Sequence, residues 1–143
     1  MGFSYKLFLL TLAILAVFGE AEDTIFSGEK LSSGQFIENP PYKFIMQNDC
    51  NLVLYKLDKA LWASNTRGHG DECVVLLQKN GNLVMSSGSD VIWSSSSSRG
   101  PNSYRLVVQT DGNVVIYGGA TWATNTMQSS KKLHTKVNIL AGP

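Results

Sequence analysis

Residues 47–55 read QNDCNLVLY, and this stretch decides the fold because two further copies follow it. The copies are QKNGNLVMS at 78–86 and QTDGNVVIY at 109–117, so each begins 31 residues after the one before. A tryptophan follows every copy, in WASNT, WSSSS and WATNT: Trp62, Trp93 and Trp122. A fixed period of this length indicates a few similar units that bury their apolar faces by packing together.

Each copy predicts an antiparallel hairpin with a three-residue loop. The last loop residue then adopts the left-handed conformation, which glycine accepts freely and which Cys50 must tolerate. This loop length places Met46 opposite Leu52 and Phe44 opposite Leu54. The other copies give equivalent apolar pairs: Leu77 with Leu83, Val75 with Met85, Val108 with Val114 and Leu106 with Ile116. Because this face is apolar in all three copies, we expect it to form the core, with the polar residues on the outer face.

The composition indicates an all-β domain. Short runs of Val, Ile, Leu, Phe and Tyr alternate with Gly, Asn, Asp and Ser, and no stretch beyond the N-terminal segment combines helical spacing with a cap and a stop. Residues 23–130 contain eight Lys or Arg and nine Asp or Glu. This balance gives no reason to expect binding to nucleic acid or to an anionic membrane surface.

The two ends of the chain differ from the repeats. Lys6 precedes an apolar run that ends at Phe18, followed by small or polar residues, which is the order of a secretory signal peptide. We expect a signal peptide at 1–21, a folded domain at 22–127 and a processed C-terminal extension at 128–143. The apolar run is too short for a comfortable membrane span. We therefore expect the secretory pathway, secretion or vacuolar delivery, and no membrane insertion.

Cys50 and Cys73 are the cysteines of the chain. An even count in a secreted chain predicts a disulfide. Two sulfurs with His69 as the only nearby histidine are a poor metal site, so we expect no metal ion. We interpret the three tryptophans as structural core residues around a central axis; a role in stacking against sugars is the alternative.

The outer face of the hairpins gathers side chains suited to a neutral sugar. Carboxylate, amide and phenol groups accept from and donate to neighbouring hydroxyls, and valine offers an apolar floor. The first cluster is Gln47, Asp49, Asn51, Val53 and Tyr55, and the third is Gln109, Asp111, Asn113, Val115 and Tyr117. Asp, Asn and Gly also belong in turns for local reasons. Turn chemistry alone does not explain why Gln and Tyr recur at the same offsets.

The repeated Q-x-D-x-N-x-V-x-Y pattern, the cysteine spacing and the WASNT and WATNT segments resemble the bulb-type mannose-binding lectins of monocot plants over about residues 23–126. The resemblance implies a β-prism of three four-stranded antiparallel sheets with pseudo-threefold symmetry and central tryptophans. It implies metal-independent binding of terminal α-D-mannose and high-mannose glycans, without a cofactor, in plant defence or storage. It also implies a homodimer or homotetramer formed by exchange of C-terminal strands.

The middle copy departs from this pattern. Asn80 stands where the motif has Asp, and Ser86 stands where it has Tyr. Gln78, Asn82 and Val84 remain, so we expect a degraded middle site. Asn80 lacks the charge that strengthens a hydrogen bond, and a serine is too short to replace the tyrosine hydroxyl.

Two other functions have to be weighed against a lectin. A glycosidase needs paired carboxylates, and each intact copy supplies one acid with no second acid at a recurring offset. We therefore expect no enzymatic activity. The alternative function is a non-catalytic protein-binding or taste-modifying module on the same scaffold, with reduced sugar binding.

Overall fold

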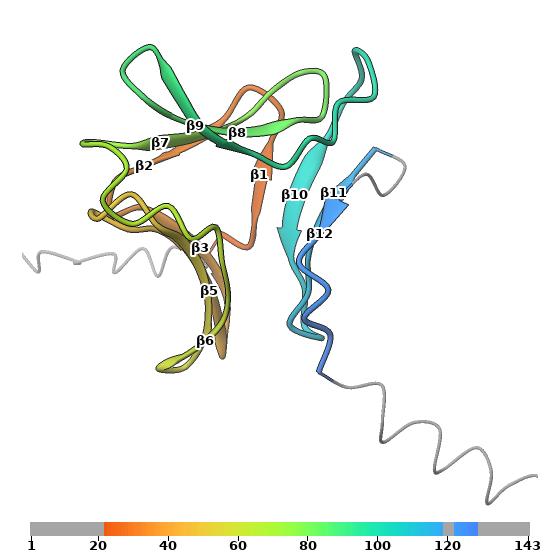
Figure 1. Ribbon diagram of the computed structural model, residues 1–143. Helices are drawn as coiled ribbons and strands as arrows, with labels where there is room; N and C mark the ends of the chain where they lie inside the picture. Colours follow the sequence, from red (N-terminus) through yellow and green to blue (C-terminus); the bar gives the residue numbers. More distant parts are fainter. Residues whose placement is uncertain (1–21, 119–121, 129–143) are drawn as a thin grey trace, which may run out of the picture.

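The computed structural model describes residues 22–118 and 122–128 (Figure 1). The expected signal peptide lies outside the described residues, as does the expected C-terminal extension apart from Gln128. Within the described ranges, no helix has the length and apolar character that crossing a bilayer requires.

The described strands form three four-stranded antiparallel sheets that face one another around a common axis (Figure 1). The first sheet has the order β3 (Phe36–Asn39), β4 (Tyr42–Met46), β5 (Leu52–Lys56), β6 (Lys59–Ala63). The second has the order β2 (Lys30–Ser32), β7 (Val74–Leu77), β8 (Leu83–Ser87), β9 (Asp90–Ser94). The third has the order β1 (Thr24–Phe26), β10 (Arg105–Val108), β11 (Val114–Tyr117), β12 (Trp122–Ala123). The predicted all-β prism is confirmed.

The central hairpins have the predicted register. Met46 pairs with Leu52 and Phe44 with Leu54, and the four pairs expected in the other two copies are also present. The last loop residue is left-handed in every copy, with φ of 65° at Cys50, 83° at Gly81 and 79° at Gly112. The loop length and the segregation of apolar side chains are therefore confirmed.

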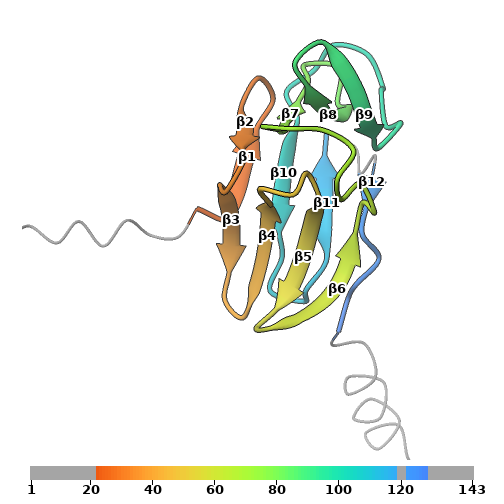
Figure 2. The same ribbon diagram turned by 60° about the vertical axis from the view of Figure 1, so that its left-hand side comes forward.

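The N-terminal segment runs around one end of the prism and gives one edge strand to each sheet (Figure 2). Its buried residues Ile25, Leu31 and Ile37 are evenly spaced and pair with core residues of β10, β7 and β4. Alternation along these short strands leaves Phe26 and Phe36 outside. The sequence repeat did not predict these strands, because the segment contains no copy of the motif.

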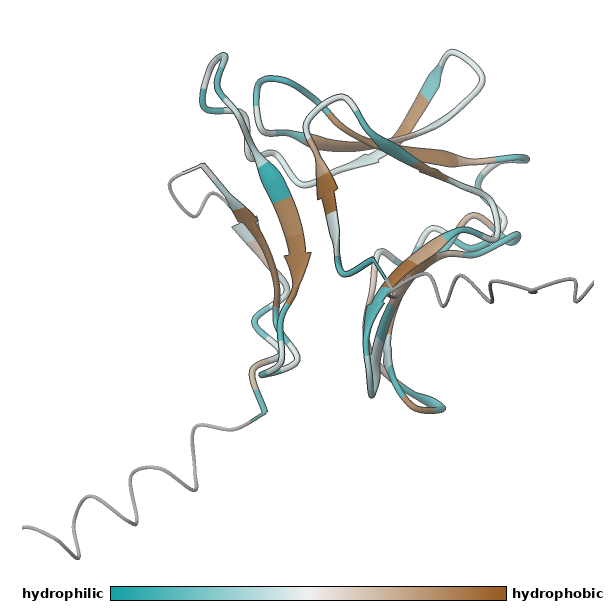
Figure 3. Cartoon of the chain, turned by 180° about the vertical axis from the view of Figure 1, so that it is seen from behind, coloured by the Kyte–Doolittle hydropathy of each residue, from teal (hydrophilic) through white to brown (hydrophobic). Residues whose placement is uncertain are grey.

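The core lies between the three sheets. Apolar residues concentrate in the strands while the loops are mostly hydrophilic (Figure 3). At the end of the prism opposite the N-terminal strands, the indoles of Trp62, Trp93 and Trp122 lie edge to face, with ring centroids 5.5 to 6.0 Å apart. Each indole is only partly buried and packs against the buried cluster. The tryptophans thus close one end of the prism and are not fully enclosed.

Three junctions between the sheets are related by the repeat. Tyr42 and Tyr104 each cover a loop glycine of another sheet: a Cβ added to Gly112 would come within 2.6 Å of the Tyr42 ring, and one added to Gly81 within 2.7 Å of the Tyr104 ring. The equivalent residue of the middle unit is Cys73, which forms a disulfide with Cys50. The predicted disulfide is confirmed. It stands where each of the other two junctions has a tyrosine ring packed against a glycine.

Candidate functional site

Two hydrogen bonds on the outer face of the first hairpin involve four of the five predicted residues, and Asn51 takes part through its backbone. The Gln47 amide Nε2 donates to the Tyr55 hydroxyl over 2.6 Å. The Asn51 backbone N–H donates to Asp49 Oδ1 over 3.0 Å, which fixes the aspartate within the loop. The loop is closed by a bond from the Cys50 N–H to the Gln47 carbonyl. These bonds are local, so the hairpin itself positions the polar groups.

The third hairpin repeats this geometry. The Gln109 amide donates to the Tyr117 hydroxyl, and the Asn113 N–H donates to Asp111 Oδ1 over 2.9 Å. The same partners, atom for atom, form both arrangements. The chain therefore presents two equivalent polar clusters on two different sheets.

The asparagine that recurs at the same position in the three copies has a structural role that was not predicted from the sequence. The side-chain carbonyl of Asn51 accepts from the Ser64 hydroxyl and from the Thr66 N–H, both over 3.2 Å. Asn82 and Asn113 make the equivalent bonds to the segments that follow Trp93 and Trp122; the partners are Ser95, Ser97, Thr124 and Thr126. A hydroxyl residue at the second and fourth positions after each tryptophan was the sequence signal for this contact.

These internal bonds determine which polar atoms still point outward. The asparagine carbonyl and one aspartate oxygen are used by the fold, as is the glutamine amide. Three groups of the first cluster have no protein partner among the described residues. They are the acceptor Gln47 Oε1, the donor Asn51 Nδ2 and the O–H of Tyr55, which accepts from Gln47 but donates to no protein atom. The cluster therefore offers acceptors and donors side by side, which is what vicinal hydroxyl groups need.

The middle hairpin keeps the loop and lacks the tyrosine. The Asn82 N–H donates to Asn80 Oδ1 over 3.0 Å, so the replacement of Asp preserves the loop bond. Ser86 occupies the tyrosine position, opposite Val74. A groove of about 530 Å³ beside this hairpin is lined by Gln78 and Asn80, among other residues. The middle copy thus keeps the glutamine and an amide at the loop but has no tyrosine hydroxyl.

The valines differ in their accessibility. Val53 is 2% exposed and Val115 is 6% exposed, whereas Val84 of the middle copy is half-buried. A tyrosine lies two residues after the first two valines on the same face, and the short Ser86 leaves Val84 less covered. Val53 and Val115 therefore offer a ligand little surface in the described conformation.

The first and third clusters also differ in charge. Arg67 Nε lies 3.6 Å from Asp49 Oδ2, and the arginine side chain is 82% exposed. Asp111 has no such ion pair within the described part of the chain. The second aspartate oxygen therefore has an exposed cationic neighbour at the first cluster and no such neighbour among the described residues at the third.

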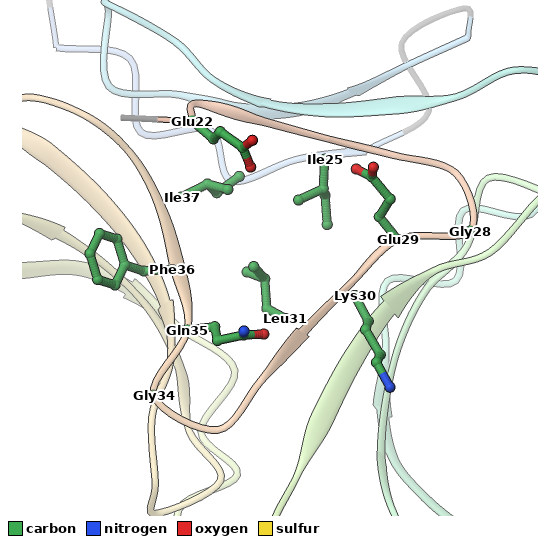
Figure 4. A pocket seen from close by; sticks show the side chains of 10 residues that line it. All are labelled: Glu22, Ile25, Gly28, Glu29, Lys30, Leu31, Gly34, Gln35, Phe36 and Ile37. Atoms are coloured by element: carbon green, nitrogen blue, oxygen red, sulfur yellow. The ribbon is translucent and has the colours of Figure 1, made fainter. Parts of the chain in front are cut away.

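A cavity of about 610 Å³ lies away from all three hairpin faces, at the end of the prism built by β1, β2 and β3 (Figure 4). Ile25, Leu31 and Ile37 point into it, with Glu22 and Glu29 among the residues at its rim (Figure 4). Its lining mixes apolar and charged residues and lacks the Gln, Asp, Asn and Tyr pattern that the repeat provides. Within the described residues, no group of three or more His, Cys, Asp or Glu is placed to hold a metal ion.

Comparison with known proteins identifies relatives along the whole repeat region. No family model matches the chain. Among solved structures, monomeric monocot mannose-binding lectins from Gastrodia elata share 45% identity with a TM-score of 0.73, covering 74% of this chain and 99% of that one. The mannose-specific agglutinin of Galanthus nivalis bulbs, complexed with methyl-α-D-mannoside, shares 44% identity with a TM-score of 0.67 over 73% of this chain and 97% of that one.

Curated relatives match the chain over a shorter alignment. The mannose-specific lectin of Dendrobium findlayanum is 44% identical over 75 residues, which are 52% of this chain and 45% of the relative. The chain thus spans about half the length of the curated relatives it matches. The near-complete coverage of the solved structures, the three sheets and the recurring motif lead to one conclusion: the chain belongs to the family of bulb-type, monocot mannose-binding lectins.

Proposed function

We propose that the protein is a non-catalytic lectin that binds terminal α-D-mannose at its first and third hairpins without a metal ion. The observation that carries this proposal is the matching pair of hydrogen bonds at the two hairpins, from the glutamine amide to the tyrosine hydroxyl and from the asparagine N–H to the aspartate. The assigned residues are Gln47, Asp49, Asn51, Val53 and Tyr55 at the first site, and Gln109, Asp111, Asn113, Val115 and Tyr117 at the third.

The chemistry of the cluster supports a neutral sugar. The remaining aspartate oxygen accepts a hydroxyl proton, the asparagine amide donates to a hydroxyl oxygen, and the tyrosine hydroxyl can do either. The Galanthus nivalis and Polygonatum cyrtonema relatives were solved with mannosides, which supports the same ligand class here. Because Val53 and Val115 are nearly buried, we assign most of the affinity to hydrogen bonds.

The middle hairpin contributes less to this function. Asn80 keeps the loop together but carries no charge, and Ser86 cannot reach the position of a tyrosine hydroxyl. A hydrogen bond to a charged group contributes about 1.5–3 kcal/mol, against about 1 kcal/mol for a neutral one. Two effective sites per chain follow. Agglutination then depends on linking weak sites, because avidity rises with the number of engaged sites.

We also propose that the mature lectin comprises residues 22–127 and travels the secretory pathway to secretion or a vacuole. The fully buried Cys50–Cys73 disulfide supports an oxidising compartment. Assembly into a homodimer or homotetramer through C-terminal strands stays a prediction. In the single chain, β12 pairs with β11 of the same molecule.

Retention on a mannose column tests the proposal. Native protein should be retained with or without EDTA and eluted by methyl α-mannoside. The double variant Tyr55→Phe with Tyr117→Phe should pass through the column, since each site loses a hydroxyl that bonds the sugar. Ser86→Ala is the matched control and should be retained. Loss of retention in EDTA would contradict the metal-free mechanism, and flow-through of native protein would contradict mannose binding.

A glycan-turnover assay tests the non-catalytic part of the proposal. Incubation of the purified protein with high-mannose glycans should leave their masses unchanged. Release of a sugar that disappears in the Asp49→Asn, Asp111→Asn double variant would show instead that the aspartates act in catalysis.

A further inference from the structure

The loop of the middle hairpin contains the pair Asn80–Gly81, the one place in the sequence where glycine follows asparagine. Asparagine is among the chemically labile residues of proteins. The peptide nitrogen that follows it can attack the side-chain amide carbon, and a side chain on the following residue hinders this attack. Glycine leaves the attack unhindered because it has no side chain. Local chemistry therefore makes Asn80 the most reactive asparagine of the chain.

The fold keeps this reactive pair in place. Gly81 has a φ of 83°, and a Cβ added there would come within 2.7 Å of the Tyr104 ring. Asn80 closes the loop, because its Oδ1 accepts from the Asn82 N–H over 3.0 Å. Packing thus excludes the larger residues that would protect the asparagine.

Two hydrogen bonds of the loop polarise the groups that would react. The Asn82 N–H withdraws electron density from the side-chain amide of Asn80, and it is placed to bond the oxyanion that forms when the amide carbon is attacked. The Arg99 N–H donates to the backbone carbonyl of Asn80 over 2.8 Å. Because this carbonyl belongs to the same peptide group as the Gly81 N–H, the bond makes that N–H more acidic. The amide carbon and the attacking nitrogen are both activated.

A third hydrogen bond opposes the reaction. The Gly81 N–H donates to the Gln78 carbonyl over 3.0 Å, so the nitrogen has to leave this partner before it attacks. Gly81 is also buried, beneath the Tyr104 ring. The rate in native protein should therefore depend on how often the second hairpin opens.

We propose that Asn80 is a site of spontaneous deamidation. The Gly81 nitrogen gives up its proton and forms a bond to Asn80 Cγ. The bond from Cγ to the side-chain nitrogen breaks, and this nitrogen takes up a proton and leaves as ammonia. Water then adds to one of the two carbonyl carbons of the resulting succinimide ring and opens it to aspartate or to isoaspartate. Water is the one co-reactant, and no group is oxidised or reduced.

The hairpin distinguishes the two products. Aspartate keeps the loop acceptor, since Asp111 bonds the Asn113 N–H in the same way in the third copy. Isoaspartate instead passes the main chain through the former side-chain carbon, which lengthens the loop beneath Tyr104. Deamidated molecules then divide into a folded, more acidic form and a form with a loosened second hairpin. The reaction does not depend on the proposed sugar binding.

Incubation of native protein at mildly alkaline pH, followed by peptide mass spectrometry, tests the proposal. Asn80 should become acidic, while Asn82 in the same tryptic peptide should stay an amide because Leu83 follows it. An endoproteinase that cleaves before aspartate should cut the aspartyl product and leave the isoaspartyl product intact. Conversion should be about 2- to 10-fold slower than in the reduced protein in urea, the factor that corresponds to one hydrogen bond on the Gly81 nitrogen.

Two tyrosine variants, both assayed below their melting temperatures, test the role of the loop. Tyr104→Ala uncovers Gly81 and should raise the native rate at Asn80 toward the rate in urea. Tyr42→Ala is the matched control: it uncovers Gly112 in the third hairpin and should leave the rate at Asn80 unchanged. Equal acceleration by both variants overturns the control of the reaction by the second hairpin. An Asn80 amide that persists in native protein while it is lost in urea overturns the proposal, as does equal conversion of Asn82.

Discussion

Replacing the Cys50–Cys73 disulfide by a glycine and a tyrosine tests whether the three sheet junctions are physically equivalent. The double change is Cys50→Gly with Cys73→Tyr, which reproduces the contact that Tyr42 makes with Gly112 and Tyr104 with Gly81. The comparison is the double change to alanine at both cysteines, which removes the bridge and adds no tyrosine.

The expected magnitude follows from three contributions. Losing a bridge with a sequence separation of 23 residues costs about 3 kcal/mol in the chain-entropy picture. Glycine at φ 65° relieves left-handed backbone strain of about 1 kcal/mol. Burying a large apolar ring contributes about 1.5–3 kcal/mol, and Tyr42 and Tyr104 are both buried at their junctions. The glycine and tyrosine variant should therefore stay within about 1 kcal/mol of native protein, whereas the alanine variant should lose about 3 kcal/mol.

Urea denaturation, followed by tryptophan fluorescence at equilibrium, measures both differences. The midpoint of the glycine and tyrosine variant should lie close to that of native protein at an unchanged slope. If this variant is no more stable than the alanine variant, the junctions are not equivalent and the disulfide does more than replace a packed ring.

Three further outcomes follow from the structure. Asn82→Ala should lower the free energy of unfolding by about 1–3 kcal/mol without weakening mannose binding, because the Ser97 N–H loses its acceptor. Gln78→Ala is the control, and an unchanged denaturation midpoint of Asn82→Ala would argue against a structural role of Asn82. Trp93→Ala should cost about 3 kcal/mol, the low end of the range for a buried ring, since the indole is partly exposed; a native melting temperature with lost sugar binding would favour the stacking alternative. Arg67→Ala should tighten mannose binding at the first site by about 2- to 5-fold in low salt, because Asp49 loses a competing partner worth under about 1 kcal/mol; weaker binding in titration calorimetry would show that Arg67 contacts the sugar.

Much of the fold could be predicted because the repeat determines both the length of the hairpin loop and the alternation of apolar and polar residues along the strands. A loop of different length would have paired Gln47 with Leu52, so the apolar face of the hairpin determined the register. The N-terminal strands could not be predicted in the same way. Strands of three residues, such as β1 and β2, carry too short a pattern to indicate which hairpin they join.

The candidate site shows a similar division. The proximity of Gln, Asp and Tyr follows from the length of the hairpin loop together with strand alternation, so the sequence predicted it. The role of the asparagine carbonyl depends on a contact with the segment that follows a tryptophan strand, more than ten residues away, which no local pattern contains. The near-complete burial of Val53 was not predicted, because strand alternation gives the face on which a residue lies and not how far its neighbours cover it.

The way the N-terminal segment is shared has a consequence for how the chain folds during synthesis. β1 pairs with β10, and Thr24 cannot form its pair until the ribosome has added Val107, more than eighty residues later. Contacts between such distant positions slow folding, and the β1 edge cannot be paired until almost the whole domain has emerged. The same arrangement makes it unfavourable to add or delete one of the three repeated units. Removing the middle unit would leave β2 without a partner, and adding a fourth would create a sheet for which the N-terminal segment has no strand. Such a domain is expected to diverge by substitution within its three units and to keep their number fixed.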